Sequence, residues 1–350
     1  MVSRRRFLQT TAVAAGALAT RSFSAEQGRQ QKTPIIDMHV HFIRKLASAP
    51  IYVPGFKDNP LVSHWTWHEH SGDLYVQEMN MAGVDMALLK TFNAEDIAFP
   101  LKEEFGAEPQ QFESSEGYML EFRDKYPDRF IWAATVNPMI EGFKERWQAK
   151  FLNGLKGIVL FPGLQDHKLD HPNITWLLEE CTQRGMKRVL MSFENVSRSN
   201  TAADYNKQLY AMMDSFPKLH YDFLHTGFQV PHMLERQPTL DLINHFNRKY
   251  DNVWAQSDNY YLDTRYPFPT HLAGTKDLFD NIGPDRVIWG TDWPWIENIG
   301  KYYQFVQSVN ENCTYMSAEQ KAKFLGGNAL DFLALPELDA RFGRSRGTGA

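Results

Sequence analysis

The chain of 350 residues is 43% hydrophobic and carries a formal net charge of −5 at pH 7. It can bury a large core, and its length fits one α/β barrel or two smaller domains. Lysine and arginine do not cluster outside the extreme N-terminus, so the charge excludes nucleic acid as an expected partner and leaves a small-molecule substrate as the default. The two cysteines, Cys181 and Cys313, give no disulfide framework.

Residues 1–25 are expected to be an export signal rather than part of the fold. Ser3-Arg4-Arg5-Arg6-Phe7-Leu8 precedes a run of small apolar residues that is too short to span a bilayer. The pattern resembles the twin-arginine export signal, which implies a periplasmic or secreted protein with no membrane association after cleavage. Ala17-Leu18-Ala19 and Ser22-Phe23-Ser24 both fit a cleavage site, and the sequence does not choose between them.

Short β-rich runs with helix-like stretches between them follow this segment. The expected strands are Ile35–His41, Val84–Thr91, Phe130–Val136, Leu155–Phe161, Arg188–Phe193, His220–His225, Val253–Ser257 and Arg286–Gly290. Many of the runs are almost entirely apolar, which is typical of strands buried on both faces of a parallel sheet. Glu116–Tyr126 and Asn173–Arg184 are expected helices, because each ends at a proline or a glycine.

Eight strands with intervening helices predict an α/β fold, a TIM (β/α)8 barrel, as a single domain over residues 34–336. The tail over residues 337–350 is expected to fray. The alternative arrangement of the same elements is a doubly wound open sheet. No glycine-rich phosphate-binding loop follows the first strand, so the usual reason to prefer that alternative is missing.

The first expected strand ends in two histidines, His39 and His41. Residues i and i+2 of a strand point to the same face, so both imidazoles are expected to project in one direction from a rigid backbone. This is the geometry of a pair of metal ligands. Catalytic groups of parallel α/β folds lie at the carboxyl ends of strands, where this pair is placed.

A long connection, from Phe42 to about Gly72, follows the first strand. Loops of this length in compact domains are usually functional or disordered, and the aromatic residues Trp65 and Trp67 favour an ordered lid. A second pair of spaced histidines, His68-Glu69-His70, has no strand before it and is interpreted as lid or surface.

Two further strand ends carry titratable residues. The sixth strand runs into His225 and the eighth into Asp292. The first and eighth strands of a barrel are neighbours, so His39, His41, His225 and Asp292 are expected to converge at one rim. Two imidazoles and one carboxylate, with a coordination position left for water, are a catalytic rather than a structural metal site.

These motifs resemble a known family. Ile36-Asp37-Met38-His39-Val40-His41 is similar to the strand-one signature of the amidohydrolase superfamily. Gly290-Thr291-Asp292-Trp293-Pro294 resembles the strand-eight motif of its amidohydrolase-2 branch, the group similar to aminocarboxymuconate-semialdehyde decarboxylase, and residues 326–333 resemble the C-terminal signature of that branch. The resemblance implies that His39, His41 and Asp292 bind one divalent ion, zinc or alternatively manganese. It also implies that Asp292 accepts a proton and that His225 contacts the substrate or the activated water.

The sequence departs from the branch at the fifth strand. The branch has a metal-binding histidine at the end of that strand, whereas residues 189–194 contain none, so Glu194 is a candidate oxygen ligand. Otherwise the ion is held more weakly, or the protein is a metal-independent relative, similar to the pyrone-dicarboxylate lactonase group. The fourth strand lacks the lysine that bridges two metals in binuclear members, which favours a single ion.

The expected function is hydrolysis of a lactone, ester or amide of a small organic acid by metal-activated water, with Asp292 as base and His225 as oxyanion stabiliser. The alternative is non-oxidative decarboxylation of an aromatic or unsaturated acid, and a non-catalytic binding barrel is the rival class. Arg44 and Trp293 are candidate substrate-binding residues. Arg198 and Arg265 are further candidates for holding a carboxylate. Assembly into a homo-oligomer stays open.

Overall fold

A computed structural model gives the fold of the chain. Residues 33–350 group into one compact unit. The structure describes residues 33–42, 70–91, 116–163, 165–193, 200–226, 236–258, 263, 265–294, 296–297 and 299–345. The expected signal over residues 1–25 and most of the expected ordered lid over residues 42–72 lie outside these ranges, so both stay predictions from the sequence.

The sheet has eight parallel strands in the order β1 to β8. Their bounds are Ile36–Val40 (β1), Met86–Lys90 (β2), Phe130–Thr135 (β3), Gly157–Leu160 (β4), Arg188–Met191 (β5), His220–Phe223 (β6), Val253–Ser257 (β7) and Val287–Trp289 (β8). Each lies within the strand expected from the sequence. The prediction of a TIM barrel is confirmed, and the doubly wound alternative is wrong.

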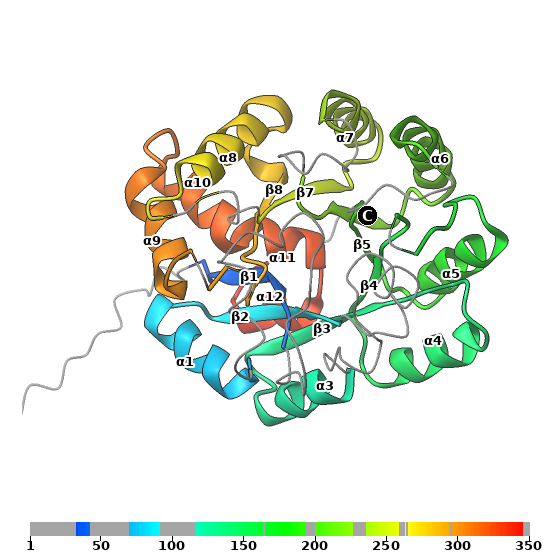
Figure 1. Ribbon diagram of the computed structural model, residues 1–350, viewed down its shortest axis with the longest axis horizontal. Helices are drawn as coiled ribbons and strands as arrows, with labels where there is room; N and C mark the ends of the chain where they lie inside the picture. The colour runs from blue at the N-terminus through cyan, green and yellow to red at the C-terminus, as the bar shows by residue number, and fades with distance from the viewer. Residues whose placement is uncertain are drawn as a thin grey trace, which may run out of the picture. The chain divides into compact units, whose positions relative to one another are not determined.

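The helices surround the strands (Figure 1). Their bounds are Gly72–Ala82 (α1), Glu116–Lys125 (α3), Phe143–Leu152 (α4), Pro172–Gln183 (α5), Ala202–Ser215 (α6), Arg236–Tyr250 (α7), Pro269–Ile282 (α8), Tyr302–Asn312 (α9), Ala318–Ala322 (α10), Asn328–Leu333 (α11) and Pro336–Arg341 (α12). A 3-10 turn at Pro284–Arg286 (η4) and a π-helical turn at Lys323–Gly327 (η5) join them. The two helices expected from the sequence are confirmed as α3 and α5.

The apolar core has two parts, which follow from the alternation of side chains along the strands. One part lies between the strands and the surrounding helices and includes Leu89, Ile158 and Trp289. The other fills the barrel interior with residues such as Met38 and Val159 and continues into α11 and α12. Buried aliphatic layers inside the barrel are the usual filling of this fold.

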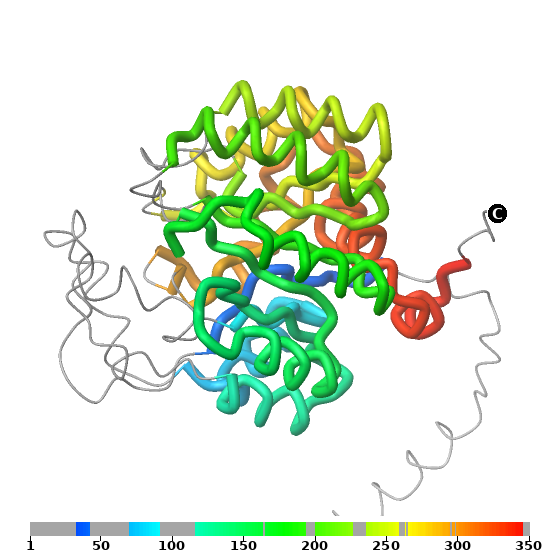
Figure 2. Tube along the Cα trace, turned by 90° about the vertical axis from the view of Figure 1, so that its right-hand side faces the viewer, coloured from blue at the N-terminus to red at the C-terminus, as the bar shows by residue number. Residues whose placement is uncertain are grey.

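Helix α11 closes the barrel at the end where the strands begin. Figure 2 shows α11 and α12, drawn in red, at that end of the barrel. Arg188, the first residue of β5, donates from its guanidinium to the carbonyl oxygens of Leu333 and Ala334. The sequence places the start of a frayed tail at residue 337, within α12, and there Leu338 is buried with the interior cluster. The helical structure therefore continues past that boundary.

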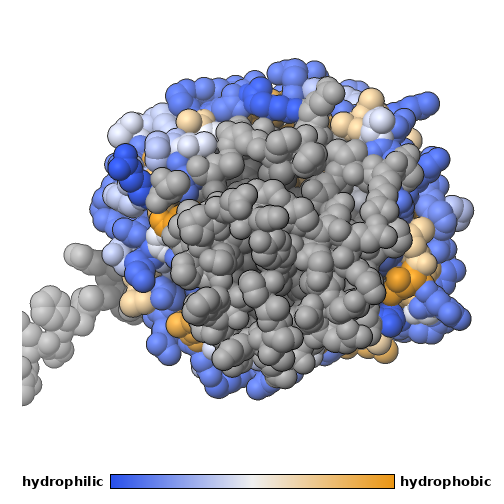
Figure 3. All heavy atoms as spheres, viewed as in Figure 1, coloured by the Kyte–Doolittle hydropathy of each residue, from blue (hydrophilic) through white to orange (hydrophobic). Residues whose placement is uncertain are grey.

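Apolar side chains at the described surface are scattered. Figure 3 shows a mostly hydrophilic surface among the described residues. Leu152 and Met81 are the most exposed of their large apolar side chains, at 75% and 63%. Within the described ranges no helix is long and apolar enough to cross a membrane.

Candidate metal and catalytic site

A β-bulge in β1 aims the two histidines into the barrel. Asp37 pairs with Ala87, and Val40 pairs with Leu89. Between these two pairs β1 advances by three residues and β2 by two, so β1 contains one extra residue. Without the extra residue, His39 would share the face of Asp37, whose carboxylate is directed toward α1 and α9. Bulges commonly re-aim side chains beside active sites. The two histidines point in the same direction, as expected from the sequence, because their Nε2 atoms lie 3.1 Å apart.

The outer nitrogen of each imidazole is fixed by an acceptor. His39 Nδ1 lies 2.5 Å from Asp258 Oδ2, and His41 Nδ1 lies 2.8 Å from the carbonyl oxygen of Lys90. A carboxylate and a carbonyl can only accept, so both Nδ1 atoms carry the proton and both Nε2 atoms present a lone pair. This second layer of hydrogen bonds is the usual way in which proteins orient histidine ligands of a metal.

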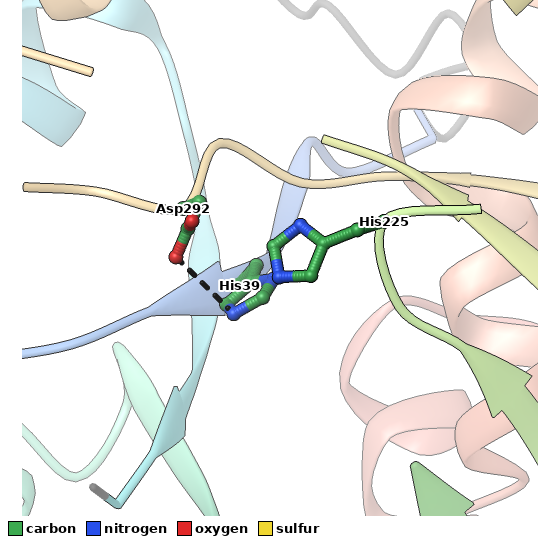
Figure 4. Close-up of side chains that lie close together, drawn as sticks. All are labelled: His39, His225 and Asp292. Atoms are coloured by element: carbon green, nitrogen blue, oxygen red, sulfur yellow. Dashed lines mark ion pairs between the residues drawn. The ribbon is translucent and has the colours of Figure 1, made fainter. Parts of the chain in front are cut away.

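Asp292 completes a triangle with these two nitrogens. Its Oδ1 lies 3.3 Å from His39 Nε2, a pair drawn in Figure 4, and 3.3 Å from His41 Nε2. Among the described residues this oxygen has no hydrogen bond of good geometry. Burial would raise the pKa of Asp292, but the neighbouring His39, His41 and His225 hold it below its usual value, so the group is a carboxylate.

Three atoms with lone pairs therefore face one another inside a buried space, and they repel unless a cation or a proton lies between them. Ligands held at about 2.0–2.1 Å around a tetrahedral zinc ion are separated by about 3.3 Å, close to the three edges seen here. Burial, and then the charge of Lys90, lower the pKa of His39 to about 4, which keeps it neutral at pH 7 as a metal ligand must be. The donor set fits one divalent ion.

His225 joins the same group from β6. Its ligand atom and those of His39 and Asp292 all lie within 4.8 Å of one another. Figure 4 shows its ring directed toward the other two side chains. His225 Nδ1 lies 3.0 Å from Asp258 Oδ1, and its backbone N–H donates to the same oxygen over 3.1 Å. The four residues expected to converge at the rim are brought together.

Sequence reasoning missed Asp258, which follows β7 and is fully buried. Its two carboxylate oxygens serve two histidines, His39 and His225. Burial alone would raise the pKa of Asp258, but these two imidazoles hold it well below its usual range. The signal that singled out His225, a titratable residue directly after a buried strand, applies equally to Asp258.

The backbone at the two proposed catalytic residues is unusual. His225 has φ 52° and Asp292 has φ 59°, both in the left-handed region that residues other than glycine rarely adopt. Such conformations cost about 1–3 kcal/mol and concentrate at functional sites. Both residues lie at the point where a strand gives way to a loop, and the turn directs each side chain across the rim.

Asp37 holds the ends of β1 and β8 together beneath the site. Its Oδ1 accepts from the backbone N–H groups of His39 and Thr291, each over 3.0 Å, and its Oδ2 accepts from the hydroxyls of Thr291, Tyr75 and Tyr302. Backbone bonds from Asp292 N to His39 O and from His41 N to Trp293 O close the barrel at this point. The seam of the barrel therefore runs through the site.

Other residues named from the sequence have different positions. Trp293 is 1% exposed and packs its ring against Tyr75 and His70, so the contacts shown are packing contacts and its role toward substrate stays a prediction. Arg265 is exposed in the loop between β7 and α8. Arg44, Glu194 and Arg198 lie outside the described residues.

The family of the chain follows from comparison with known proteins. The model of the amidohydrolase family Amidohydro_2 matches residues 36–335. The chain belongs to this amidohydrolase family. It is 25% identical over 297 residues to the 2-amino-3-carboxymuconate-6-semialdehyde decarboxylase of Dictyostelium discoideum, covering 75% of this chain and 76% of the relative.

Solved structures share the fold. A probable 2-pyrone-4,6-dicarboxylic acid hydrolase of Acinetobacter baumannii, with citric acid bound, matches with a TM-score of 0.58 at 15% identity and covers 86% of this chain and 99% of its own. An amidohydrolase of Burkholderia multivorans with bound zinc matches with a TM-score of 0.58 at 16% identity, covering 87% and 100%. At these identities the likeness concerns the fold alone.

Proposed function

We propose that this amidohydrolase-family protein is an enzyme with one divalent metal ion, zinc by preference, that hydrolyses an ester, lactone or amide bond of a small organic acid. The observation that carries the proposal is the convergence of His39 Nε2, His41 Nε2 and Asp292 Oδ1 with separations of 3.1–3.3 Å. A divalent ion at this place acts as a Lewis acid that polarises a carbonyl and lowers the pKa of water.

The residues of the chain divide the remaining work between them. Asp292 is an ionised, buried carboxylate at the rim, and it takes the proton that the attacking water releases. His225, as the imidazolium ion paired with Asp258 through Nδ1, donates from its other ring nitrogen toward the oxygen on which negative charge develops. Asp258 holds the rings of His39 and His225 in place through one carboxylate. Burial of all these groups excludes bulk water and strengthens their electrostatic effect.

Decarboxylation is the second candidate, supported by the similarity to a decarboxylase over three quarters of the chain. The same residues serve this reaction. A bound ion would hold the substrate carboxylate. The proton that replaces CO₂ on carbon would come from the imidazolium form of His225, or from Asp292 after it has taken a proton from water. The two reactions differ at the reacting carbon. In hydrolysis, water attacks a carbonyl carbon; in decarboxylation, a ring or chain carbon receives a proton.

The test combines metal analysis with a two-substrate assay. Protein purified with zinc supplied is expected to hold one zinc per chain. It is then incubated with 2-pyrone-4,6-dicarboxylate and with 2-amino-3-carboxymuconate-6-semialdehyde, the compounds named for its relatives. Ring opening without release of CO₂ supports hydrolysis, and release of CO₂ supports decarboxylation. A protein that binds no divalent ion contradicts the proposal in both forms.

Asp292→Asn separates a catalytic carboxylate from a mere ligand. The amide keeps an oxygen for the ion but takes up no proton at neutral pH. We expect appreciable zinc content, a near-parental melting temperature and a loss of kcat of about 10²–10⁴-fold. If Asp292 were only the cap of the segment after β8, asparagine would replace it with near-normal kinetics. A zinc-replete variant with parental turnover refutes the catalytic role.

A further inference from the structure

The upper part of the barrel interior contains charged and polar side chains directly beneath the metal site. Lys90 at the end of β2, Asp222 in β6 and Gln256 in β7 are all fully buried. The layers below them are apolar, with residues such as Leu88 and Ile288, as is usual for this fold. The proposed reaction uses none of the three polar side chains.

Lys90 is connected to the site in two ways. Its carbonyl oxygen accepts from His41 Nδ1 and fixes the tautomer of that ring. Its ammonium group crosses the barrel and donates to Gln256 Oε1 over 2.8 Å. The side chain thus ties the end of β2 to β7.

Gln256 lies beside His39. A Cβ atom added to Gly290 would come within 2.7 Å of Gln256 Nε2 and within 3.0 Å of His39 Cβ, so the Gln256 amide and the His39 side chain share the space above this glycine. Only a glycine at this position, directly after β8, leaves room for both. The place of the Gln256 amide therefore bears on the space left for the His39 side chain.

Asp222 supplies the counter-charge for Lys90. Neither carboxylate oxygen of Asp222 has a hydrogen-bond partner among the described residues, and no direct ion pair with Lys90 forms there. The two groups interact through charge across the interior, since each alters the pKa of the other. Burying a separated ammonium and carboxylate is costly, and replacing such a pair by well-packed apolar residues is often neutral or stabilising. The stability of the barrel therefore does not account for these charges beside the metal site.

We propose that Lys90 is a positioning residue of the metal centre: through Gln256 it sets the place of the His39 side chain, with Asp222 as one of its buried counter-charges. The inference rests on the metal site of the proposed function. It assigns Lys90 no contact with substrate or with the reacting atoms.

The test uses the double variant Lys90→Met/Asp222→Asn. Methionine and asparagine remove both charges and are close in volume to the residues that they replace, so the fold is expected to survive where Lys90→Met alone leaves Asp222 without a counter-charge. Cobalt(II) replaces zinc as a probe, because its visible absorption reports the geometry of the ligands. We expect a melting temperature near the parental one, an altered cobalt(II) spectrum and a metal affinity lowered about 10–100-fold.

Arg188→Met is the matched control. Arg188 is a buried cation that lines the same interior at its other end, where it bonds the carbonyls of α11. This variant is expected to lose stability while keeping the parental cobalt(II) spectrum and affinity. A control that disturbs the spectrum as much as the double variant shows a general loosening of the barrel and overturns the proposal.

The remaining outcomes separate this inference from the proposed function. If the parent binds cobalt(II) and the double variant has the same spectrum and affinity, the role of Lys90 is overturned but the metal site is not. A parent that binds no cobalt(II) or zinc overturns the metal site and the inference with it. A double variant with a changed spectrum, reduced affinity and intact fold supports the positioning role.

Discussion

Asp258 connects two histidines of the candidate site through one carboxylate. Its carboxylate contacts His39 Nδ1 through one oxygen and both His225 Nδ1 and His225 N through the other. One residue therefore sets the tautomer of a metal ligand and the orientation of the proposed oxyanion stabiliser. Outer-shell acceptors of this kind raise the basicity of the histidine that they hold.

Asp258→Asn tests this arrangement at the residue scale. An amide is neutral and accepts through one oxygen only, so both histidines lose their anionic acceptor and one of them meets an N–H donor instead. We expect zinc affinity to fall about 10–100-fold, and kcat to fall even at saturating zinc because His225 is no longer held. Competition with a chelator measures the affinity, and turnover at saturating metal measures the second effect.

Asp263→Asn is the control for Asp258→Asn. Asp263 is also a buried carboxylate of the loop after β7, and it accepts from the backbone N–H groups of Thr270 and His271 at the start of α8. Asparagine caps a helix about as well as aspartate, so this variant is expected to keep zinc affinity and turnover. Equal losses in both variants are inconsistent with a specific role of Asp258.

At the scale of the element, β1 shows which side-chain directions a periodic pattern predicts and which it does not. The spacing of His39 and His41 predicts a shared face, and the structure bears this out. The same period would place Asp37 on that face too, but the bulge sends Asp37 outward and the histidines inward. Nothing in the sequence of β1 marks the extra residue, because the register depends on the partner strand.

Asp37→Ala is expected to weaken the junction of β1 and β8. The change leaves the buried N–H groups of His39 and Thr291 without their acceptor, at about 1–3 kcal/mol for each group. We expect a loss of about 3 kcal/mol or more in the free energy of unfolding, measured in urea. Zinc affinity should fall with it, since the same N–H groups belong to the segment that carries the ligands.

Tyr302→Phe provides the comparison within the same cluster. It removes one hydroxyl that donates to Asp37 Oδ2 and leaves the acceptor with its other donors. A loss of about 1 kcal/mol is expected. If Asp37→Ala costs no more than Tyr302→Phe, the carboxylate does not organise this junction.

At the scale of the whole molecule, the eight strands could be predicted because each is a short apolar run bounded by polar or turn residues. The rim residues could be predicted because each follows such a run. The interior positions of Lys90, Asp222 and Gln256 could not be predicted. A single polar or charged residue inside an apolar strand gives no sign of whether it faces the barrel interior. The sequence also gives no sign of the helical structure in α12, because residues 337–350 are mostly polar or small; among the described ones, Leu338 is buried in the interior cluster and Phe342 packs against it.

Buried histidines make the stability of the whole barrel depend on pH. Burial lowers the pKa of His167 to about 4 and that of His271 to about 4, whereas an exposed imidazole titrates near 6.5. Between these values the unfolded chain takes up protons that the folded chain does not. Stability is therefore full above about pH 6.5 and falls as the pH decreases toward 4.

His167→Gln tests this linkage with the metal removed by a chelator. The His167 ring lies 3.0 Å from Gln165 Oε1, and the amide of glutamine can donate to the same oxygen, so the fold is expected to be kept. The variant has one titrating group fewer. Its free energy of unfolding should therefore fall less between pH 7 and pH 4.5 than that of the parent, by at most about 3 kcal/mol for a shift of this size. Urea unfolding at steps of pH gives both curves. Parallel curves for parent and variant would mean that His167 takes up its proton in the folded chain as readily as in the unfolded one.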